Sequence, residues 1–281
     1  MLRRLVPGLL IAAAMCACTK TLPISEPRLV VDGWIDEGGH PVVMVSTTLS
    51  LSEQKQGAEE IKDAIVRWAD VRVSVDGVTT TLVGRKDERY SIPYIYTDHS
   101  VTGVAGKTYE LSVSYAGMNV TASTTIPRRV PLDSIRTELL EGEDYLLDIY
   151  FSDPPEKGDR YRIFTQSISE GESAGAQCFP TLLGTLSDEN FNGESVSCSV
   201  LPPVGMTATG YDINFKSGTT VHLKFCTMDE DAYLYWKGYD DSRMFAGSPL
   251  FPGTNSLISN ISGGLGLWAG YGASYYTVSI P

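Results

Sequence analysis

Residues 109–126, YELSVSYAGMNVTASTTI, are the stretch that decides the fold class. Apolar and polar side chains alternate over residues 109–115, which is typical of a β-strand with one buried face. Ala116 and Gly117 then make a short turn, and a second strand pattern follows over residues 119–126. Two such segments joined by so short a turn predict a β-hairpin.

Similar signals lie on the N-terminal side of this hairpin. A second hairpin is expected to turn at Asp76 and Gly77, and residues 59–68 are expected to form a short helix. The strands expected in this half lie at residues 28–36, 41–50, 71–75 and 79–83. Short strands at regular spacing predict an immunoglobulin-like or fibronectin-like β-sandwich over residues 28–127.

The C-terminal half begins after a stiff linker, PRRVP, at residues 127–131. Its expected strands lie at residues 146–151, 161–168, 221–226 and 275–280. Residues 229–239 are expected to form a helix, because the acidic residues in its first turn suit the positive helix end. We therefore predict an all-β protein, in which the N-terminal sandwich is followed by a second β-sandwich-like domain, residues 132–281, with one short helix.

The first residues have the form of an export signal. Two arginines precede an apolar stretch that is shorter than the about 20 residues needed to span a bilayer. Cys18 follows directly, with bulky Met15 at position −3 and small Ala17 at position −1, as at the modified cysteine of bacterial lipoproteins. We expect cleavage after residues 1–17, lipidation of Cys18 and a tether over residues 18–27. The alternative is ordinary signal cleavage that leaves a free cysteine.

The balance of charge excludes one class of partner. The formal net charge is −12, and loss of Arg3 and Arg4 with the leader makes it −14. Phosphate binding needs clustered Lys and Arg, so nucleic acid is not an expected partner. The apolar fraction of 42% is enough for a packed core.

Three cysteines remain after processing. Cys178 and Cys198 both lie in a loop-rich segment, and they are the expected disulfide of an exported protein. Cys226 lies in an apolar strand pattern and is expected as a small core residue.

Several segments resemble those of a known family. They are LVVDGWID at residues 29–36, the hairpin with the proline that follows it, PLDSI at 131–135, LSDENFNG at 186–193, AYLYWKGYDDS at 232–242 and NISGGLGLW at 260–268. In this order they resemble the Bacteroidota outer-membrane lipoprotein family called domain of unknown function 4249. The resemblance implies an outer-membrane location and genes encoded beside TonB-dependent receptors. It carries over no catalytic residue.

One motif points to hydrolase chemistry. Residues 171–175, GESAG, match the nucleophile-elbow pattern around Ser173, and Asp212 and His222 follow in triad order. The pattern requires a helix directly after the serine, but the residues that follow are a poor helix start. We interpret the segment as a flexible loop, and a serine hydrolase is the least favoured function.

A second motif points to calcium. Asp188, Asn190 and Asn192, followed by Gly193, match the first half of a calcium loop, in which alternate side-chain oxygens surround a hard cation. Ser199 stands where the bidentate glutamate would be, so another carboxylate would be needed. A polar loop that ends in a turn is the alternative interpretation.

Aromatic residues are the remaining candidates for ligand binding. Trp268 and Tyr271 lie in a glycine-rich segment, residues 263–272, and we expect them to be exposed there. The other aromatic residues follow helical or strand spacing, which favours core packing. The histidines lack metal-site spacing and are expected in turns or on the surface; they are His40, His99 and His222.

We therefore predict a lipid-anchored, non-enzymatic binding or accessory module at the outer membrane. A TonB-dependent receptor is the partner that the family resemblance implies, and no cofactor is expected. The alternative is a stand-alone surface protein that binds glycans or peptides. The sequence leaves open which face of the outer membrane the protein occupies.

Overall fold

The structure is a computed structural model that describes residues 26–48, 63–140, 142–203, 213–244 and 257–281. The expectations for the leader, for Cys18, for most of the tether and for Asp212 lie outside the described residues. Of the helix expected over residues 59–68, only residues 63–68 are described. Among these, Asp63 and Ala64 are helical. No helix within the described ranges is long and apolar enough to cross a membrane.

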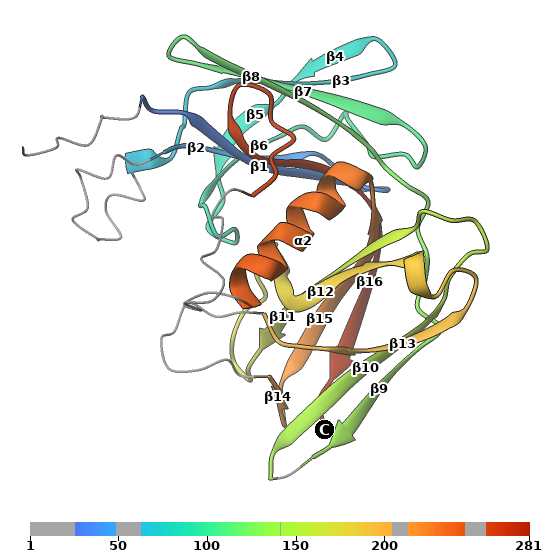
Figure 1. The fold of residues 1–281 in the computed structure, drawn as a ribbon. Helices are drawn as coiled ribbons and strands as arrows, with labels where there is room; N and C mark the ends of the chain where they lie inside the picture. Colours follow the sequence, from blue (N-terminus) through green and yellow to red (C-terminus); the bar gives the residue numbers. More distant parts are fainter. Residues whose placement is uncertain (1–25, 49–62, 141, 204–212, 245–256) are drawn as a thin grey trace, which may run out of the picture.

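The all-β prediction is confirmed, because strands dominate the described residues and form three sheets (Figure 1). The largest sheet has eight strands in the order β12-β11-β15-β16-β1-β2-β6-β5. Its strands are β1 (Leu29–Asp36), β2 (Val42–Thr47), β5 (Val83–Lys86), β6 (Tyr94–Thr97), β11 (Arg160–Ile168), β12 (Phe179–Ser187), β15 (Thr220–Met228) and β16 (Leu265–Ser279).

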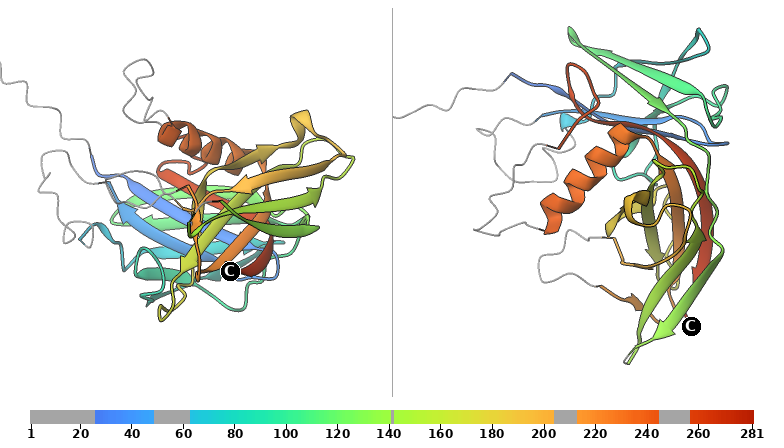
Figure 2. Two further views of the ribbon diagram at one scale, coloured as in Figure 1. Left: turned by 90° about the horizontal axis from the view of Figure 1, so that it is seen from below. Right: turned by 45° about the vertical axis from the view of Figure 1, so that its right-hand side comes forward.

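Two four-stranded sheets pack against this eight-stranded sheet. The first contains β3 (Asp70–Val75), β4 (Val78–Thr81), β7 (Thr108–Tyr115) and β8 (Met118–Thr125). The second contains β9 (Ser134–Leu139), β10 (Asp144–Ser152), β13 (Ser195–Val200) and β14 (Phe215–Lys216). Helix α2 (Glu230–Met244) lies on the other face of the curved large sheet (Figure 2), and a short 3-10 helix, η2 (Asp188–Asn190), follows β12.

The side chains of β16 alternate between the two faces of the large sheet, and they show which elements pack on each face. Trp268 lies in the core shared with the first small sheet, whereas Tyr276 and Val278 pack in the core shared with the second. These positions are an even number of residues apart, so they share one face of the strand. Leu267 and Tyr271 point to the opposite face, where α2 packs.

Both hairpins expected from the sequence are confirmed. Strands β3 and β4, like β7 and β8, pair antiparallel across two-residue turns. In the second turn Ala116 and Gly117 both have positive φ angles, 48° and 81°. Turns of this kind match the right-handed twist of the strands that they join.

Residues 265–272 of the glycine-rich segment, where Trp268 and Tyr271 were expected to be exposed, belong instead to β16, so that expectation is wrong. β16 pairs in parallel with β1 and antiparallel with β15. The strand near the end of the chain is thus a neighbour of the first strand. The expected division into residues 28–127 and 132–281 therefore cuts through one continuous sheet.

Two glycines of β16 explain why this segment lacks side chains. A Cβ atom on Gly270 would lie 2.9 Å from Cγ1 of Ile126, and one on Gly272 would lie 2.5 Å from the carbonyl oxygen of Pro127. The linker between the two small sheets therefore crosses β16 where only glycine leaves room. Sequence alone shows the glycines but not the chain that passes over them.

Trp268 closes the core between β16 and the first small sheet. Its side chain is 0% exposed, and its Nε1 donates a hydrogen bond to the carbonyl oxygen of Tyr109 at 2.9 Å. We expect Trp268→Ala to lower the free energy of unfolding by about 3–5 kcal/mol, the usual effect of truncating a large core aromatic. Trp68, which is 86% exposed, is the matched control, and Trp68→Ala should change that free energy by less than about 0.5 kcal/mol. Urea unfolding followed by circular dichroism measures both, and equal effects would contradict the placement of Trp268.

Candidate functional site

Strand β1 contributes two side chains to the candidate site. Leu29, Val31 and Ile35 are buried in the core under the first small sheet. The intervening Asp32 and Trp34 face the opposite side, because side chains alternate along a strand. There they line a cavity between the large sheet and helix α2, which we call the α2 cavity.

Helix α2 covers this cavity. Asp229 caps the start of the helix, since its Oδ1 accepts a hydrogen bond from the backbone N of Ala232 at 3.0 Å. Trp236 packs edge-on against Phe164 of β11 with ring centroids 5.2 Å apart, and its Nε1 donates to the Tyr271 hydroxyl at 2.8 Å. The helix expected from the sequence is confirmed, and it is longer than expected.

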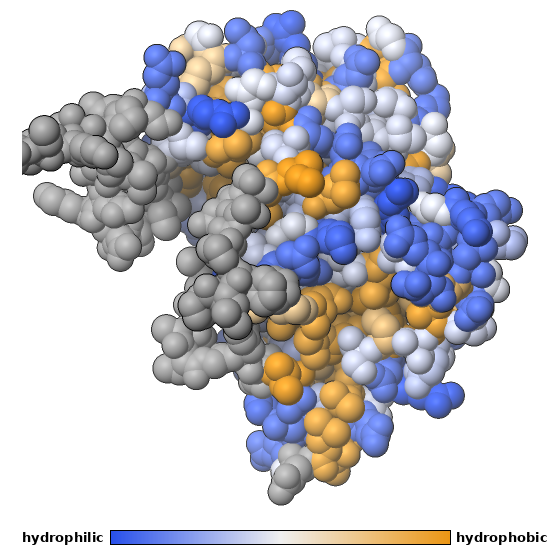
Figure 3. All heavy atoms as spheres, in the orientation of Figure 1, coloured by the Kyte–Doolittle hydropathy of each residue, from blue (hydrophilic) through white to orange (hydrophobic). Residues whose placement is uncertain are grey.

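The α2 cavity has a volume of about 310 Å³ and largely aromatic walls. Its aromatic lining residues are Trp34, Phe164, Phe179, Tyr235, Trp236, Tyr239, Tyr271 and Tyr275. Two loops meet at its rim, where Oε1 of Gln177 accepts hydrogen bonds from the backbone N and Oγ of Ser91 at 3.2 and 3.0 Å. Figure 3 shows further hydrophobic residues below α2 on this side of the molecule, over β11 and β12. Small-molecule sites are typically concave, mainly apolar and equipped with few polar groups.

Lys224 of β15 is the first of two buried cations beside this cavity. Its Nζ lies 2.6 Å from Oδ1 of Asp36 and 4.4 Å from the centroid of the Tyr271 ring. The other carboxylate oxygen of Asp36 accepts a hydrogen bond from the Tyr275 hydroxyl. Both oxygens of Asp36 are therefore engaged, and the ammonium group lies between a carboxylate and an aromatic face.

Arg162 of β11 is the second cation, and its side chain is fully buried. Its Nη1 donates to Oδ2 of Asp240 in α2 at 2.8 Å, and its Nη2 donates to the carbonyl oxygen of Thr181 at 3.0 Å. The guanidinium carbon also lies 4.7 Å from the centroid of a Trp236 ring. Burial lowers the pKa of Arg162, and the charge of Asp240 opposes that shift. This pair attaches α2 to the sheet and fixes the position of the cavity wall.

Asp32 differs from the carboxylates of these two pairs. It is accessible from the cavity, and no described residue forms an ion pair or a side-chain hydrogen bond with it. Asp32 itself remains exposed to solvent, and partial desolvation by the protein atoms around its carboxylate raises the pKa of Asp32 from 3.8 to about 6. The cavity lining therefore contains a carboxylate that no described residue pairs with.

Only part of this site is predictable from the sequence. Tyr271 lines the cavity but is 3% exposed, and Trp268 is buried on the opposite face of β16, so the expected exposure of both is wrong. The two positions are an odd number of residues apart in one strand, which sends their side chains to opposite faces. A ligand-binding role for Tyr271 stays a prediction. Asp32 and Trp34 were missed, although the alternation of LVVDGWID places both on the face away from the core.

The expected disulfide between Cys178 and Cys198 is wrong, because both thiols are free. Cys178 precedes β12 and lines the α2 cavity, whereas Cys198 lies in β13 of the second small sheet. The loop-rich segment between them spans two different sheets. Cys226 is fully buried in β15, as expected, and burial raises the pKa of its thiol to about 12.

Ser173 lies in an exposed loop between β11 and β12. No helix follows it in this described loop, and His222 lies within β15 without a hydrogen bond to the serine hydroxyl. The strand, turn and helix of a nucleophile elbow are therefore not formed around Ser173.

Two histidines that are distant in the sequence lie side by side. The rings of His40 and His99 have centroids 4.6 Å apart in an edge-on arrangement. The Nδ1 atom of His40 also lies 2.9 Å from the carbonyl oxygen of Val101. Both histidines lie outside strands, and His222 lies in β15, within the strand expected over residues 221–226.

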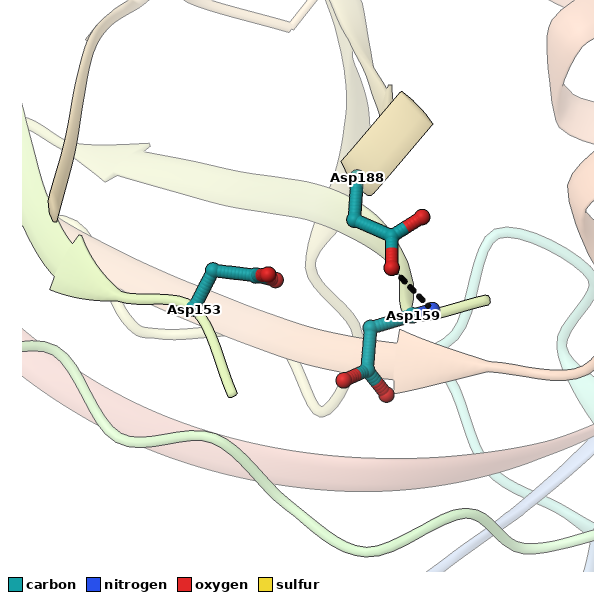
Figure 4. Close-up of side chains that lie close together, drawn as sticks. All are labelled: Asp153, Asp159 and Asp188. Carbon is teal, nitrogen blue, oxygen red and sulfur yellow. Dashed lines mark hydrogen bonds between the residues drawn. The ribbon is translucent and has the colours of Figure 1, made fainter. Parts of the chain in front are cut away.

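Asp188, the first residue of the calcium-like motif, meets two aspartates that the motif does not include (Figure 4). One carboxylate oxygen from each of Asp153, Asp159 and Asp188 lies within 4.8 Å of the other two. Asn190 is exposed, and Asn192 donates a hydrogen bond from Nδ2 to a backbone carbonyl at 3.0 Å. The donor set for a hard cation would therefore be the three aspartates, and calcium binding stays a prediction.

These carboxylates also bind the backbone of the neighbouring turns. Oδ2 of Asp188 accepts hydrogen bonds from the backbone N of Gly158 and Asp159 at 2.6 and 3.0 Å, and Oδ2 of Asp153 accepts one from another backbone N at 2.8 Å. Burial raises the pKa of Asp159; Arg128 opposes this shift, and the other two carboxylates add to it. The cluster thus joins the turn before β11 to the turn after β12.

Asp188→Ala would leave two backbone N–H groups without their acceptor. We expect the free energy of unfolding to fall by about 2–4 kcal/mol, because each unsatisfied buried donor costs about 1–3 kcal/mol. Glu189→Ala is the matched control, since Glu189 is the exposed neighbour in the same 3-10 helix. Thermal and urea unfolding measure both variants. Added calcium should raise the stability of the wild type and not of Asp188→Ala if the cluster binds the ion, whereas no effect on either would remove the calcium prediction.

Comparison with protein-family models gives a match to the family described as domain of unknown function (DUF4249), over residues 19–277. A search of the curated proteins finds no match. The matched range contains every strand of the large sheet except the last two residues of β16. The chain therefore belongs to the DUF4249 family, as the order of its sequence motifs predicts.

Proposed function

We propose that the mature protein is a lipid-anchored, non-enzymatic binding protein that holds a small ligand in the α2 cavity. The observation that carries this proposal is the cavity itself, which combines about 310 Å³ of space, aromatic walls and a carboxylate, Asp32, that no described residue pairs with. Ligand sites of small molecules have this size range and this mixture of apolar walls with few polar groups.

The cavity walls are held in place before any ligand arrives. Trp236 and Tyr271 are joined by a hydrogen bond of 2.8 Å, and Arg162 attaches the helix that carries Trp236 to the sheet through Asp240. Walls that need no ordering cost little conformational entropy on binding, which favours affinity. The geometry supports recognition, whereas the loop around Ser173 offers no comparable support for hydrolysis.

The location in this proposal rests on the leader and on family membership. The proposed leader ends at Ala17, and acylation of Cys18 would hold the protein on a membrane, which we propose to be the outer membrane. The family resemblance motivates a TonB-dependent receptor as the partner, so that the bound ligand would be passed to or from a transport protein. A stand-alone surface protein that binds glycans or peptides is the alternative, and it would use the same cavity.

Ligand binding can be tested through the tryptophans of the cavity, Trp34 and Trp236. We expect at least one compound from a panel of monosaccharides, dipeptides and small amines to change the intrinsic fluorescence of the mature protein in detergent. Ser91→Trp places a large side chain at the cavity rim and should abolish that response. Ser195→Trp, at an exposed position of β13, is the matched control and should leave it intact. A response that survives Ser91→Trp would place the ligand elsewhere.

Membrane anchoring can be tested separately from ligand binding. We expect Cys18→Ala to move the protein from the membrane fraction to the soluble fraction, because each buried CH₂ of an acyl chain contributes about 0.8 kcal/mol to membrane binding. Fractionation followed by immunoblotting measures the shift. A variant that stays with the membranes as fully as the wild type would refute the anchor and leave the cavity proposal untouched.

A further inference from the structure

We infer that the α2 cavity recognises its ligand through a cationic group, an amine or a guanidinium, that pairs with Asp32 and lies against the aromatic rings around it. This inference rests on the proposed function and names the class of ligand. Its basis is the arrangement of charges and rings at the cavity.

Two cationic side chains of the protein itself already lie between a carboxylate and an aromatic ring beside this cavity. Lys224 pairs with Asp36 at 2.6 Å and lies 4.4 Å from the centroid of the Tyr271 ring. Arg162 pairs with a carboxylate of α2 at 2.8 Å and lies 4.7 Å from the centroid of a Trp236 ring. A carboxylate neutralises each cation, and the negative face of an aromatic ring stabilises it further.

Asp32 is the third carboxylate of this group and has no such cation among the described residues. It lies four residues from Asp36 on the same face of β1, and it is close enough to Tyr235 for its charge to contribute to the raised pKa of that phenol. Lys224, the one cation among the described residues that line the cavity, is already held by Asp36. The Asp32 carboxylate lines the aromatic cavity and is open to solvent, so it is available to pair with a cation that enters there. A ligand cation would therefore complete a pattern that the other two carboxylates already show.

Charge and size separate this ligand class from others. Asp32 would repel an anionic group, because the nearby Lys224 is neutralised by Asp36. A neutral sugar could donate hydrogen bonds to Asp32, but such bonds are weaker than those from a charged donor. The volume of about 310 Å³ admits a small cationic group and its stem rather than a folded protein.

The test compares cations with neutral compounds of the same shape. Choline is paired with 3,3-dimethyl-1-butanol, and N-acetylarginine amide is paired with N-acetylcitrulline amide. Each compound is titrated into the full mature protein in detergent, and binding is followed by tryptophan fluorescence and isothermal titration calorimetry. We expect at least one cation to bind, with an affinity at least about tenfold higher than that of its neutral counterpart.

Variants of one carboxylate assign this preference to Asp32. Asp32→Asn keeps the shape and removes the charge, and it should lower the affinity for the cation at least about tenfold. Asp32→Glu keeps the charge and should retain part of the affinity, which a purely structural role would not predict. Glu189→Gln, an exposed carboxylate outside the cavity, is the matched control and should have no effect. Circular dichroism and thermal unfolding confirm that each variant is folded.

The outcomes distinguish this inference from the proposed function. If neither cation binds, if neutral counterparts bind equally well, or if Asp32→Asn binds like the wild type, the inference is refuted. Binding of a neutral sugar that Ser91→Trp abolishes would then still support the cavity as a ligand site. Absence of any Ser91-dependent binding across both panels would refute the two together.

Discussion

The parallel pairing of β16 with β1 is the interaction on which the rest of the structure depends. It places the first and the last strands side by side inside the eight-stranded sheet, with β15, β11 and β12 on one side and β2, β6 and β5 on the other. Both small sheets then pack on one face of this sheet, and the linker between them crosses at Gly270 and Gly272. The opposite face remains for helix α2 and the α2 cavity.

The helix that covers the cavity is attached at both of its ends. Asp229, at its start, accepts a hydrogen bond from the backbone N of Thr125 at 3.1 Å, and Asp240, near its end, binds the buried Arg162. A buried ion pair is weak evidence for stability, because desolvation offsets much of its attraction. The pair between Arg162 and Asp240 instead fixes the position of α2. It holds the aromatic residues of this helix over the sheet, where they form the cavity wall.

Two groups of carboxylates therefore have different roles in the molecule. Asp153 and Asp188 accept hydrogen bonds from backbone N–H groups and hold neighbouring turns together. Asp32 instead faces an aromatic cavity, and no described residue supplies it with a cation. Family membership brings no assigned activity with it, so the proposed function depends on this local chemistry. The proposed lipid anchor and the α2 cavity are independent of each other, because they depend on different residues.

Local patterns in the sequence determined the fold class, the two hairpins and the start of helix α2. Each of these depends on residues within about one turn or one strand pair of each other, such as the Ala116–Gly117 turn or the Asp229 cap. Only the tertiary structure decided the order of the strands, the separation of Trp268 from Tyr271 and the meeting of Asp188 with Asp153 and Asp159. The alternation of apolar and polar residues in one strand does not show which distant strand pairs with it, because the same alternation is compatible with many partner strands. The glycines of β16 were taken for a loop for the same reason: the backbone that passes over them comes from another part of the chain.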